Sequence, residues 1–237
     1  MKIVDSEGDW ERVLSAAAAV QRIVPDAILV GGSAAALYAK HRFSADDDHV
    51  LAELKPRFER VLSDLEEVAG WTTNRLRPPV LILGRFEGVD TGIRQLRRSA
   101  PLETTTVAGS FGIITVPTLP EMLRIKAWLV VSRNATRDYL DTVALADKLG
   151  AETTQVALQS LDALYPQETG ASVLLQLARQ MAEPKPFDLE DGDLSQYRGL
   201  SERWRSWAAV SDEAAQIAVA ILSQIQLDAK RHPKLDS

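Results

Sequence analysis

The sequence predicts an α+β protein in two parts, and three observations support this prediction. Short apolar runs alternate with segments of helical periodicity in the first part of the chain, strand signals vanish from Ala151 onward, and hydrophobic residues make up 46% of the 237 residues. We therefore expect an α+β core over residues 1–117 and an all-helical C-terminal region over 118–237.

Helical and strand-like segments alternate in the first part. Trp10, Val13 and Ala17 recur at helical spacing, and Pro25 ends that pattern. The glycine at 109 favours a hairpin turn. The predicted helices are 9–24, 33–40 and one that begins near Pro56, and the predicted strands are 27–30, 49–54, 80–83, 89–96, 104–108 and 111–116.

The second part shows only helical patterns, interrupted by polar breaks. Gly150 ends one helix, and a Pro- and Asp-rich loop is expected over 183–193. The predicted helices are 121–131, 137–149, 153–164, 170–182, 195–209 and 212–229, the first two of which could belong to either part.

Composition excludes several kinds of site. The chain has no cysteine and only three scattered histidines, which excludes disulfides, thiol nucleophiles and cysteine-bound zinc, and argues against a histidine-built metal centre. No run approaches the ~20 apolar residues of a membrane helix. We therefore expect a cytoplasmic protein with no membrane contact, in which carboxylates carry any chemistry.

The net charge of −6 is unevenly distributed. Residues 1–70 carry −5, residues 71–137 carry +6 and residues 138–237 carry −7. A basic middle segment indicates an anionic partner, although a solvated sheet face would look the same. The arginines that could contact such a partner are Arg75, Arg77, Arg94, Arg97 and Arg98.

Gly31, Gly32 and Ser33 lie where a predicted strand ends and a helix begins. Glycines let a backbone approach a phosphate closely, Ser33 can cap the helix, and the free N–H groups of the first turn attract an anion. A simple turn would use the same residues.

Three consecutive aspartates, Asp46 to Asp48, precede the next predicted strand. If Asp46 and Asp48 lie on that strand, they project from one face and repel each other, and Mg²⁺ is the natural ion between them. Asp47 would then point to the opposite face, where we expect it to be solvated. The alternative is an acidic turn at the start of a strand.

The combination of these motifs resembles the nucleotidyltransferase superfamily, in which a Gly-Ser turn is followed by an Asp-x-Asp strand. Two further patterns are similar to the AbiEii/AbiGii toxin family of type IV toxin–antitoxin systems. The first is Arg42-Phe-Ser44-Ala-Asp46-Asp-Asp48, and the second is a helix containing Lys126 followed by Arg137-Asp138-Tyr139-Leu-Asp141. His49 departs from the pattern, because an apolar residue usually follows the second aspartate; the alternatives are a packed, neutral side chain, which we expect, and a position near the site.

The resemblance implies a nucleotidyltransferase-like mixed β-sheet flanked by helices, and an enzyme that transfers a nucleoside monophosphate from an NTP to an acceptor hydroxyl. Two Mg²⁺ ions would bind Asp46, Asp48 and a third carboxylate. Asp90 is our choice for the third, with Glu87 as the alternative. If the strand alternates, Arg94 shares a face with Asp90.

The resemblance also assigns roles to other residues and partners. Nucleotide-binding residues would be Gly31, Gly32, Ser33, Arg42, Ser44 and Lys126, and catalytic residues would be Asp46, Asp48, Asp90, Lys126, Asp138 and Asp141. The acceptor would be RNA, such as a tRNA, and an antitoxin protein would be a partner. A small-molecule or protein acceptor, or a non-catalytic binding module with the same fold, are the alternatives.

Overall fold

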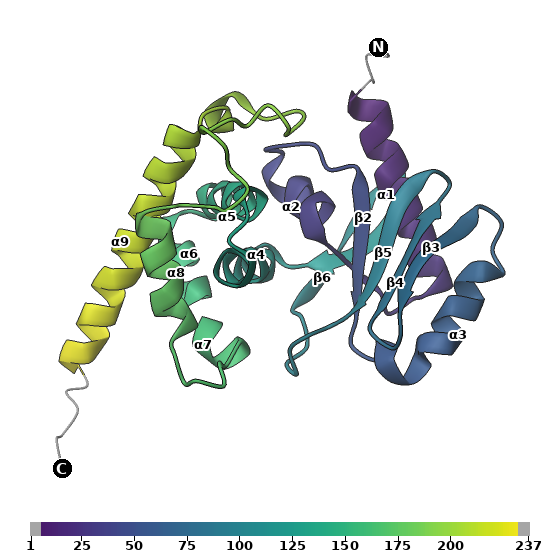
Figure 1. Ribbon diagram of the computed structural model, residues 1–237, viewed down its shortest axis with the longest axis horizontal. Coiled ribbons are helices and arrows are strands. Elements are labelled where there is room, and N and C mark those ends of the chain that lie inside the picture. The colour runs from purple at the N-terminus through teal and green to yellow at the C-terminus, as the bar shows by residue number, and fades with distance from the viewer. Residues whose placement is uncertain (1–5, 232–237) are drawn as a thin grey trace. The chain divides into compact units, whose positions relative to one another are not determined.

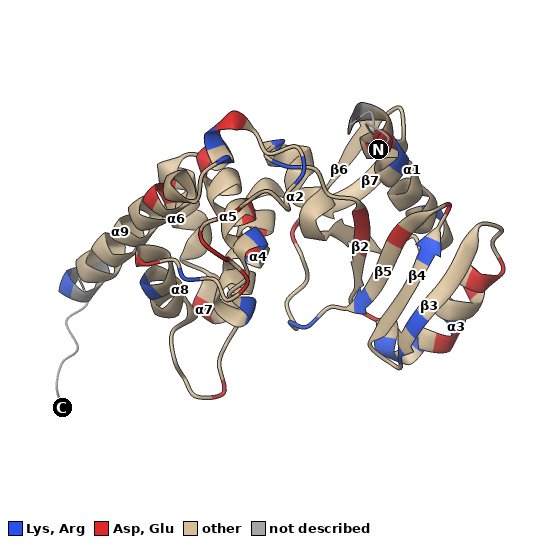
Figure 2. Cartoon of the chain, turned by 45° about the horizontal axis from the view of Figure 1, so that its top comes forward, with Lys and Arg blue, Asp and Glu red and all other residues tan. Residues whose placement is uncertain are grey.

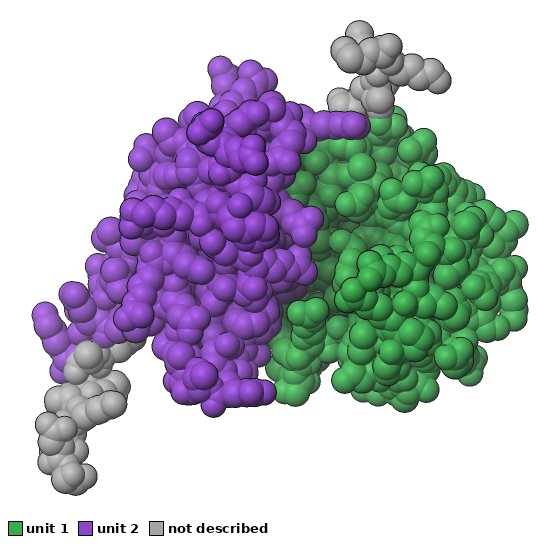
Figure 3. Space-filling view, viewed as in Figure 1, with its two compact units in different colours: residues 1–122 green, residues 123–237 purple. Residues whose placement is uncertain are grey.

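The computed structural model describes residues 6–231, which form two compact units (Figure 3). The first unit extends to Met122 and the second begins at Leu123, so the division falls within helix α4 (Leu119–Arg133). The boundary expected after residue 117 coincides with the end of strand β7 (Gly112–Pro117).

The first unit is built on a mixed five-stranded sheet (Figure 1). Its strands lie in the order β1 (Ile28–Val30), β2 (Asp46–Leu51), β5 (Val89–Gln95), β4 (Leu81–Phe86) and β3 (Trp71–Arg77). Strands β2 and β5 are parallel, and the other neighbours are antiparallel. A separate hairpin pairs β6 (Thr104–Gly109) with β7. The α+β class predicted for this part is confirmed.

Helices α1 (Ser6–Ile23) and α3 (Leu54–Glu66) pack on one face of this sheet. The core between them contains Val20 of α1, Phe58 of α3, and Leu51, Ile82 and Ile93 of the strands, all buried. Because strand side chains alternate between faces, the residues in between point to the opposite side of the sheet, which we call the open face. Helix α2 (Gly31–Ala39) connects β1 to β2.

The described residues of the second unit form helices and connecting loops and contain no strand, as predicted. Helices α8 (Val173–Ala182) and α9 (Trp207–Arg231) pack against each other, and α9 also contacts α5 (Thr136–Leu149) and α6 (Ala151–Leu158). Trp128 stacks on Tyr165 with ring centroids 4.9 Å apart, and Tyr139 meets Trp207 edge to face at 5.9 Å. Helix α7 (Leu161–Leu164) is a single turn.

Three sequence predictions need correction. Strand β3 was not predicted, because its residues are mostly polar and exposed and give no apolar alternation. A helix over 195–209 is wrong: Gly199 has a left-handed φ of 62°, and only a 3₁₀ turn at Glu202–Trp204 precedes α9. The helix expected over 153–164 is two helices, α6 and α7, separated at Gln159 and Ser160.

Between residues 6 and 231, no helix combines the length and the apolar character needed to cross a bilayer.

Candidate functional site

Strand β2 presents two of its three aspartates on the open face. The six residues alternate between exposed or half-buried and buried positions from Asp46 to Leu51. Asp46 is exposed and Asp48 is 35% exposed, while Asp47 between them is fully buried. The structure therefore starts the strand at Asp46, three residues earlier than predicted, and places Asp46 and Asp48 on the same face as expected.

Asp90 lies beside this pair on the adjacent strand. In the parallel ladder of β2 and β5, Asp46 is opposite Asp90 and Asp48 is opposite Gly92, so Asp90 shares the open face one strand spacing, about 4.8 Å, away. Glu87 lies instead in the turn between β4 and β5, exposed and with a left-handed φ of 46°. The geometry favours Asp90 over Glu87 as the third carboxylate.

Asp90 and Asp48 face arginines. Arg85 of β4 is opposite Asp90 in the ladder, and its Nη2 and Nε lie 2.9 Å and 3.0 Å from Asp90 Oδ1. Arg94 Nη2 lies 3.5 Å from Asp48 Oδ1. Figure 2 shows the resulting contrast, with acidic segments on β2 and β5 and basic segments on β3 and β4. The prediction that Arg94 lies beside the carboxylates is confirmed.

The donor chemistry and the space around Asp48 fit a hard cation. A Cβ atom at Gly92 would lie 2.6 Å from Asp48 Oδ1, and one at Gly31 would lie 3.3 Å from Oδ2, so both glycines keep room for this carboxylate. However, within residues 6–231 no three His, Asp or Glu side chains converge as metal ligands, because Asp48 and Asp90 are turned toward arginines. The metal site stays a prediction that requires these arginines to release the carboxylates.

Asp47 is not solvated, contrary to expectation. Its side chain is fully buried on the core face, where Oδ1 lies 2.8 Å from His49 Nδ1. Thr91 Oγ1, on β5, is 3.5 Å from its other oxygen. The two oxygens of this buried carboxylate therefore face side chains of β2 and β5. His49 is fully buried as well, as the packed alternative predicted.

Helix α2 begins at Gly31 rather than at Ser33. Val30 occupies the N-cap position, and no side chain caps the first turn. Ser33 is buried, and its Oγ donates to the carbonyl of Asp46 at 2.5 Å. The prediction that Ser33 caps the helix is therefore wrong, because its hydroxyl ties α2 to the start of β2 instead. The uncapped first turn still offers backbone N–H groups beside Asp48.

Gly32 is required by the segment that precedes β2. A Cβ atom here would lie 2.5 Å from Ser44 Oγ and 2.7 Å from Arg42 Nη2, so any larger residue would push this segment away from α2. Ser44 is buried, and Arg42 donates to the carbonyl of Phe43 at 3.4 Å. Both side chains therefore lie at the first turn of α2, and their contact with phosphate stays a prediction.

We compared the chain with family models, with the sequences of known proteins and with solved structures. No family model matches the chain. The chain is 36% identical over 131 residues to the heme uptake protein MmpL11 of Mycobacterium tuberculosis, and 31% identical over 138 residues to the mycolic acid-containing lipids exporter MmpL11 of Mycolicibacterium smegmatis. These matches cover 54% and 57% of this chain but only 13% and 14% of the relatives, so the chain spans a small fraction of their length.

Among solved structures, a crystal structure assigned as a nucleotidyltransferase from H. pylori aligns over 92% of this chain and 95% of its own, with a TM-score of 0.56 and 16% identity. The fold is nucleotidyltransferase-like. At this identity the likeness concerns the fold, and the site has to be argued from this chain's own residues.

The predicted residues of the second unit form a buried cluster. Lys126 of α4 and Asp141 of α5 are an ion pair, with Nζ 2.7 Å from Oδ2 and side chains 4% and 0% exposed. A lysine held in this way is already neutralised by a carboxylate. Its predicted role as a phosphate-neutralising cation stays a prediction.

Asp138, in the first turn of α5, is the unusual member of this cluster. It is fully buried, and neither carboxylate oxygen has a hydrogen-bond partner. Burial raises the pKa of Asp138; the nearby Lys126 opposes this shift and Asp141 adds to it. The position in the first turn agrees with the helix-dipole alternative for this residue.

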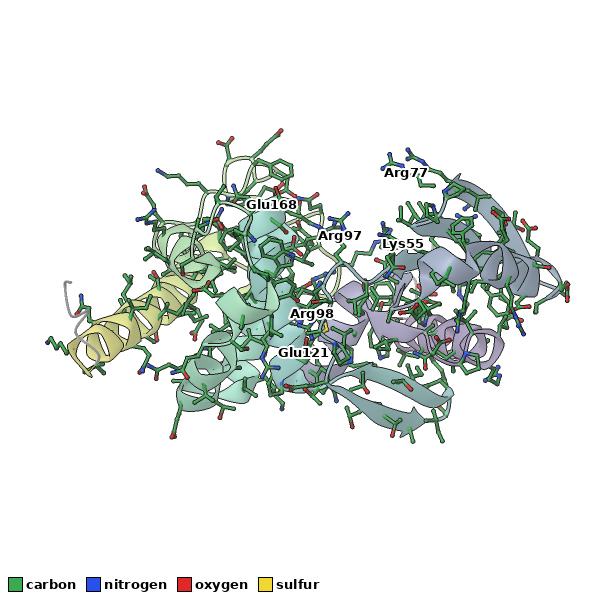
Figure 4. All side chains as sticks on the ribbon, turned by 90° about the horizontal axis from the view of Figure 1, so that it is seen from below. Lys55, Arg77, Arg97, Arg98, Glu121 and Glu168 are labelled. Atoms are coloured by element: carbon green, nitrogen blue, oxygen red, sulfur yellow. The ribbon has the colours of Figure 1, made fainter. Side chains whose placement is uncertain are left out.

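One arginine has a different role from the one expected, and another was missed by the sequence analysis. Arg98 is not available to a phosphate backbone, because its side chain is 3% exposed and its Nη2 lies 2.5 Å from Glu121 Oε1 (Figure 4). It also donates to the carbonyls of Ala100 and Pro101. Arg85 was not singled out from the sequence, although the short Glu87-Gly88 turn between the two strands would have placed it opposite Asp90.

Proposed function

We propose that this chain is a Mg²⁺-dependent nucleotidyltransferase that transfers a nucleoside monophosphate from an NTP to an acceptor hydroxyl and releases pyrophosphate. The supporting observation is the register of β2 and β5, which sets Asp46, Asp48 and Asp90 on the open face of a nucleotidyltransferase-like sheet. The uncapped start of α2 lies next to Asp48.

Asp46, Asp48 and Asp90 are the residues that would hold magnesium. When bound, the ion supplies Lewis acidity and neutralises charge on the phosphates. Carboxylate oxygens are the ligands that Mg²⁺ prefers, and the chain has no cysteine to compete for a softer metal.

The remaining groups of the open face bind and orient the nucleotide in this proposal. The first-turn N–H groups of α2 at Gly31 and Gly32 bind phosphate oxygens, as helix N-termini commonly do. Ser33 fixes this turn to the backbone of β2 through its bond to Asp46, so the anion site and the carboxylates keep a constant separation. Ser44 and Arg42 pack at the same turn.

Lys126, Asp138 and Asp141 remain candidate catalytic residues on the basis of the family resemblance. Their burial supports a structural role equally well, because removing one partner of a buried ion pair strongly destabilises the folded protein.

RNA, such as a tRNA, is the acceptor that we propose, in the context of a toxin with a cognate antitoxin. The support is the AbiEii-like sequence pattern around Arg42 and Asp138 together with the exposed arginines of the basic segment. A small molecule or a protein side chain is the alternative acceptor.

The direct test is transfer of label from each of the four NTPs to total RNA in the presence of Mg²⁺. Wild type and Asp64→Asn, which changes an exposed aspartate on α3, should label RNA equally. Asp46→Asn and Asp48→Asn should slow the transfer at least ~100-fold, because each removes a ligand of the proposed magnesium ion. Each 1.4 kcal/mol of lost transition-state stabilisation corresponds to a tenfold lower rate. The proposal fails if wild type labels neither RNA, protein nor small molecules and binds no Mg–NTP.

The toxin role has a separate test. Expression of wild type in a bacterial host should slow growth, and expression of Asp48→Asn at the same level should not. Equal growth of the two strains would remove the toxin role but would leave the transferase activity to be judged by labelling.

A further inference from the structure

Four arginines share the open face with the three carboxylates. Cross-strand neighbours define rows across the sheet, with strands about 4.8 Å apart. One row runs Thr72, Arg85, Asp90, Asp46, and another runs Arg77, Leu81, Arg94, Val50. Arg75, opposite Leu83, belongs to the row between them. The open face is therefore acidic at β2 and basic toward β3.

The four arginines fall into two pairs that differ in their partners. Arg85 and Arg94 contact Asp90 and Asp48. Arg75 and Arg77 have no carboxylate partner within residues 6–231, and Figure 4 shows Arg77 extending away from the sheet. The unpaired arginines thus offer a matched comparison on the same surface.

The ion pairs of Arg85 and Arg94 are exposed to water. The side chains of Arg85 and Asp90 are 54% and 57% exposed, and those of Arg94 and Asp48 are 44% and 35% exposed. Pairs in such surroundings are weak and separate readily. Each arginine nevertheless directs its guanidinium at the oxygen of a carboxylate that the proposed function assigns to magnesium.

A cation bound at these carboxylates competes with the arginines, because it neutralises the negative charge that holds each guanidinium. Magnesium at Asp48 and Asp90 would therefore release Arg94 and Arg85, which would leave two guanidinium groups on the same face without counter-ions. A guanidinium matches the geometry of a phosphate group as well as that of a carboxylate.

We propose that Arg85 and Arg94 are phosphate-binding residues of the substrate site, which neutralise Asp90 and Asp48 when substrate is absent and move onto phosphate oxygens when magnesium takes the carboxylates. This inference rests on the proposed function. The phosphates could belong to the triphosphate of the NTP or to the backbone of a polynucleotide acceptor, and the experiment separates these two sources.

The first arm measures Mn²⁺ binding to the full chain without nucleotide, by electron paramagnetic resonance. Arg94→Gln and Arg85→Gln should bind Mn²⁺ roughly two- to fivefold more tightly than wild type, because the carboxylates lose a competing cation. Arg75→Gln removes the same charge from the same face but breaks no ion pair with a carboxylate. It should therefore increase the affinity for Mn²⁺ by a distinctly smaller factor. Thermal unfolding of each variant verifies that it is folded.

The second arm measures binding of Mg–NTP, inorganic triphosphate and a short single-stranded RNA by calorimetry. Arg94→Gln and Arg85→Gln should weaken binding at least roughly tenfold for the ligand whose phosphates they contact. Weaker binding of Mg–NTP and triphosphate assigns the arginines to the nucleotide, and weaker binding of RNA alone assigns them to the acceptor.

The two arms must therefore change in opposite directions. Unchanged or weaker Mn²⁺ binding in Arg94→Gln and Arg85→Gln would overturn the inference, and so would unchanged binding of all three phosphate ligands. If wild type binds Mg–NTP while the variants match it in both arms, the inference fails and the proposed function survives. If wild type binds neither Mn²⁺ nor any Mg–NTP, the proposed function fails and the inference fails with it.

Discussion

Asp48 and Asp90 lie partly in solvent and face half-exposed arginines, whereas Asp138 and Asp141 are fully buried with Lys126. Both groups combine carboxylates with cations, at 2.9 Å and 3.5 Å on the open face and at 2.7 Å between Lys126 and Asp141. They differ in the surrounding medium: water screens the pairs on the open face, while the cluster in the second unit is removed from solvent.

The difference indicates which carboxylates can change partners. Separating an exposed pair costs little because water solvates both ions, so Asp48 and Asp90 can exchange an arginine for a metal ion. Separating Lys126 from Asp141 would leave a charge in a medium that solvates it poorly. We therefore expect substrate-dependent rearrangement on the open face and a fixed geometry in the buried cluster.

The largest effect is expected from Lys126→Met, which removes one partner of the buried Lys126–Asp141 ion pair. Loss of one partner of a buried pair costs about 3–5 kcal/mol of unfolding free energy, whereas Arg94→Gln should cost no more than ~1 kcal/mol. Urea unfolding measures both. The double variant Lys126→Met/Asp141→Leu should recover much of the lost unfolding free energy. A cost below ~1 kcal/mol for Lys126→Met would contradict the difference between the buried pair and the exposed pairs.

An intermediate effect is expected from Gly92→Ala on the open face. The new Cβ would lie 2.6 Å from Asp48 Oδ1 and 3.2 Å from Leu83 Cδ2, so the carboxylate must move. We expect a loss of about 1–3 kcal/mol from overpacking, together with weaker Mn²⁺ binding. Gly8→Ala in α1 meets no atom within 4 Å and should bind Mn²⁺ as wild type does. Normal Mn²⁺ affinity in Gly92→Ala would argue against Asp48 as a ligand.

Asp138 should make stability depend on pH in a predictable direction. Because burial raises its pKa in the folded state, the folded protein binds this proton more readily than the unfolded chain, and its contribution to stability is lost as the pH rises through the folded-state pKa. Urea unfolding at a series of pH values should show a smaller decline toward neutral pH in Asp138→Asn than in wild type. Identical slopes for the two proteins would exclude this contribution.

The smallest effect on stability is expected from Arg85→Gln. Its pair with Asp90 is more than half exposed, so the unfolding free energy should fall by only about 0.2–1 kcal/mol, and added salt should reduce the difference further. Urea unfolding at low and high ionic strength measures both quantities. A loss of 3 kcal/mol or more would mean that this pair resembles the buried one.

The parts of the fold with an apolar period could be predicted from the sequence. Strands β1 and β5 and helices α1 and α5 lie close to their predicted ranges, because each buries an apolar face. Strand β3 could not be recognised, since Arg75 and Arg77 are exposed and give no apolar alternation. The helix predicted over 195–209 does not form, because Trp204 lies in a 3₁₀ turn and α9 begins only at Trp207.

The sequence predicts those parts of the site that depend only on the alternation of side chains along a strand. Asp46, Asp48, Asp90 and Arg94 share a face because side chains alternate along a strand. The burial of Asp47 could not be predicted, because its side chain contacts His49 and Thr91, the second of which lies on a neighbouring strand. The burial of Arg98 likewise depends on its ion pair with Glu121, which is distant in the sequence.

The most direct measurement is a crystal structure of the chain with Mg²⁺ and an α,β-methylene NTP analogue. The account predicts oxygens of Asp46 and Asp48 about 2.0–2.1 Å from the metal, Asp90 turned toward the same site, and Arg85 and Arg94 moved from the carboxylates to phosphate oxygens. A nucleotide bound away from the open face, or bound there with no metal contact to Asp46 and Asp48, would contradict the proposed function.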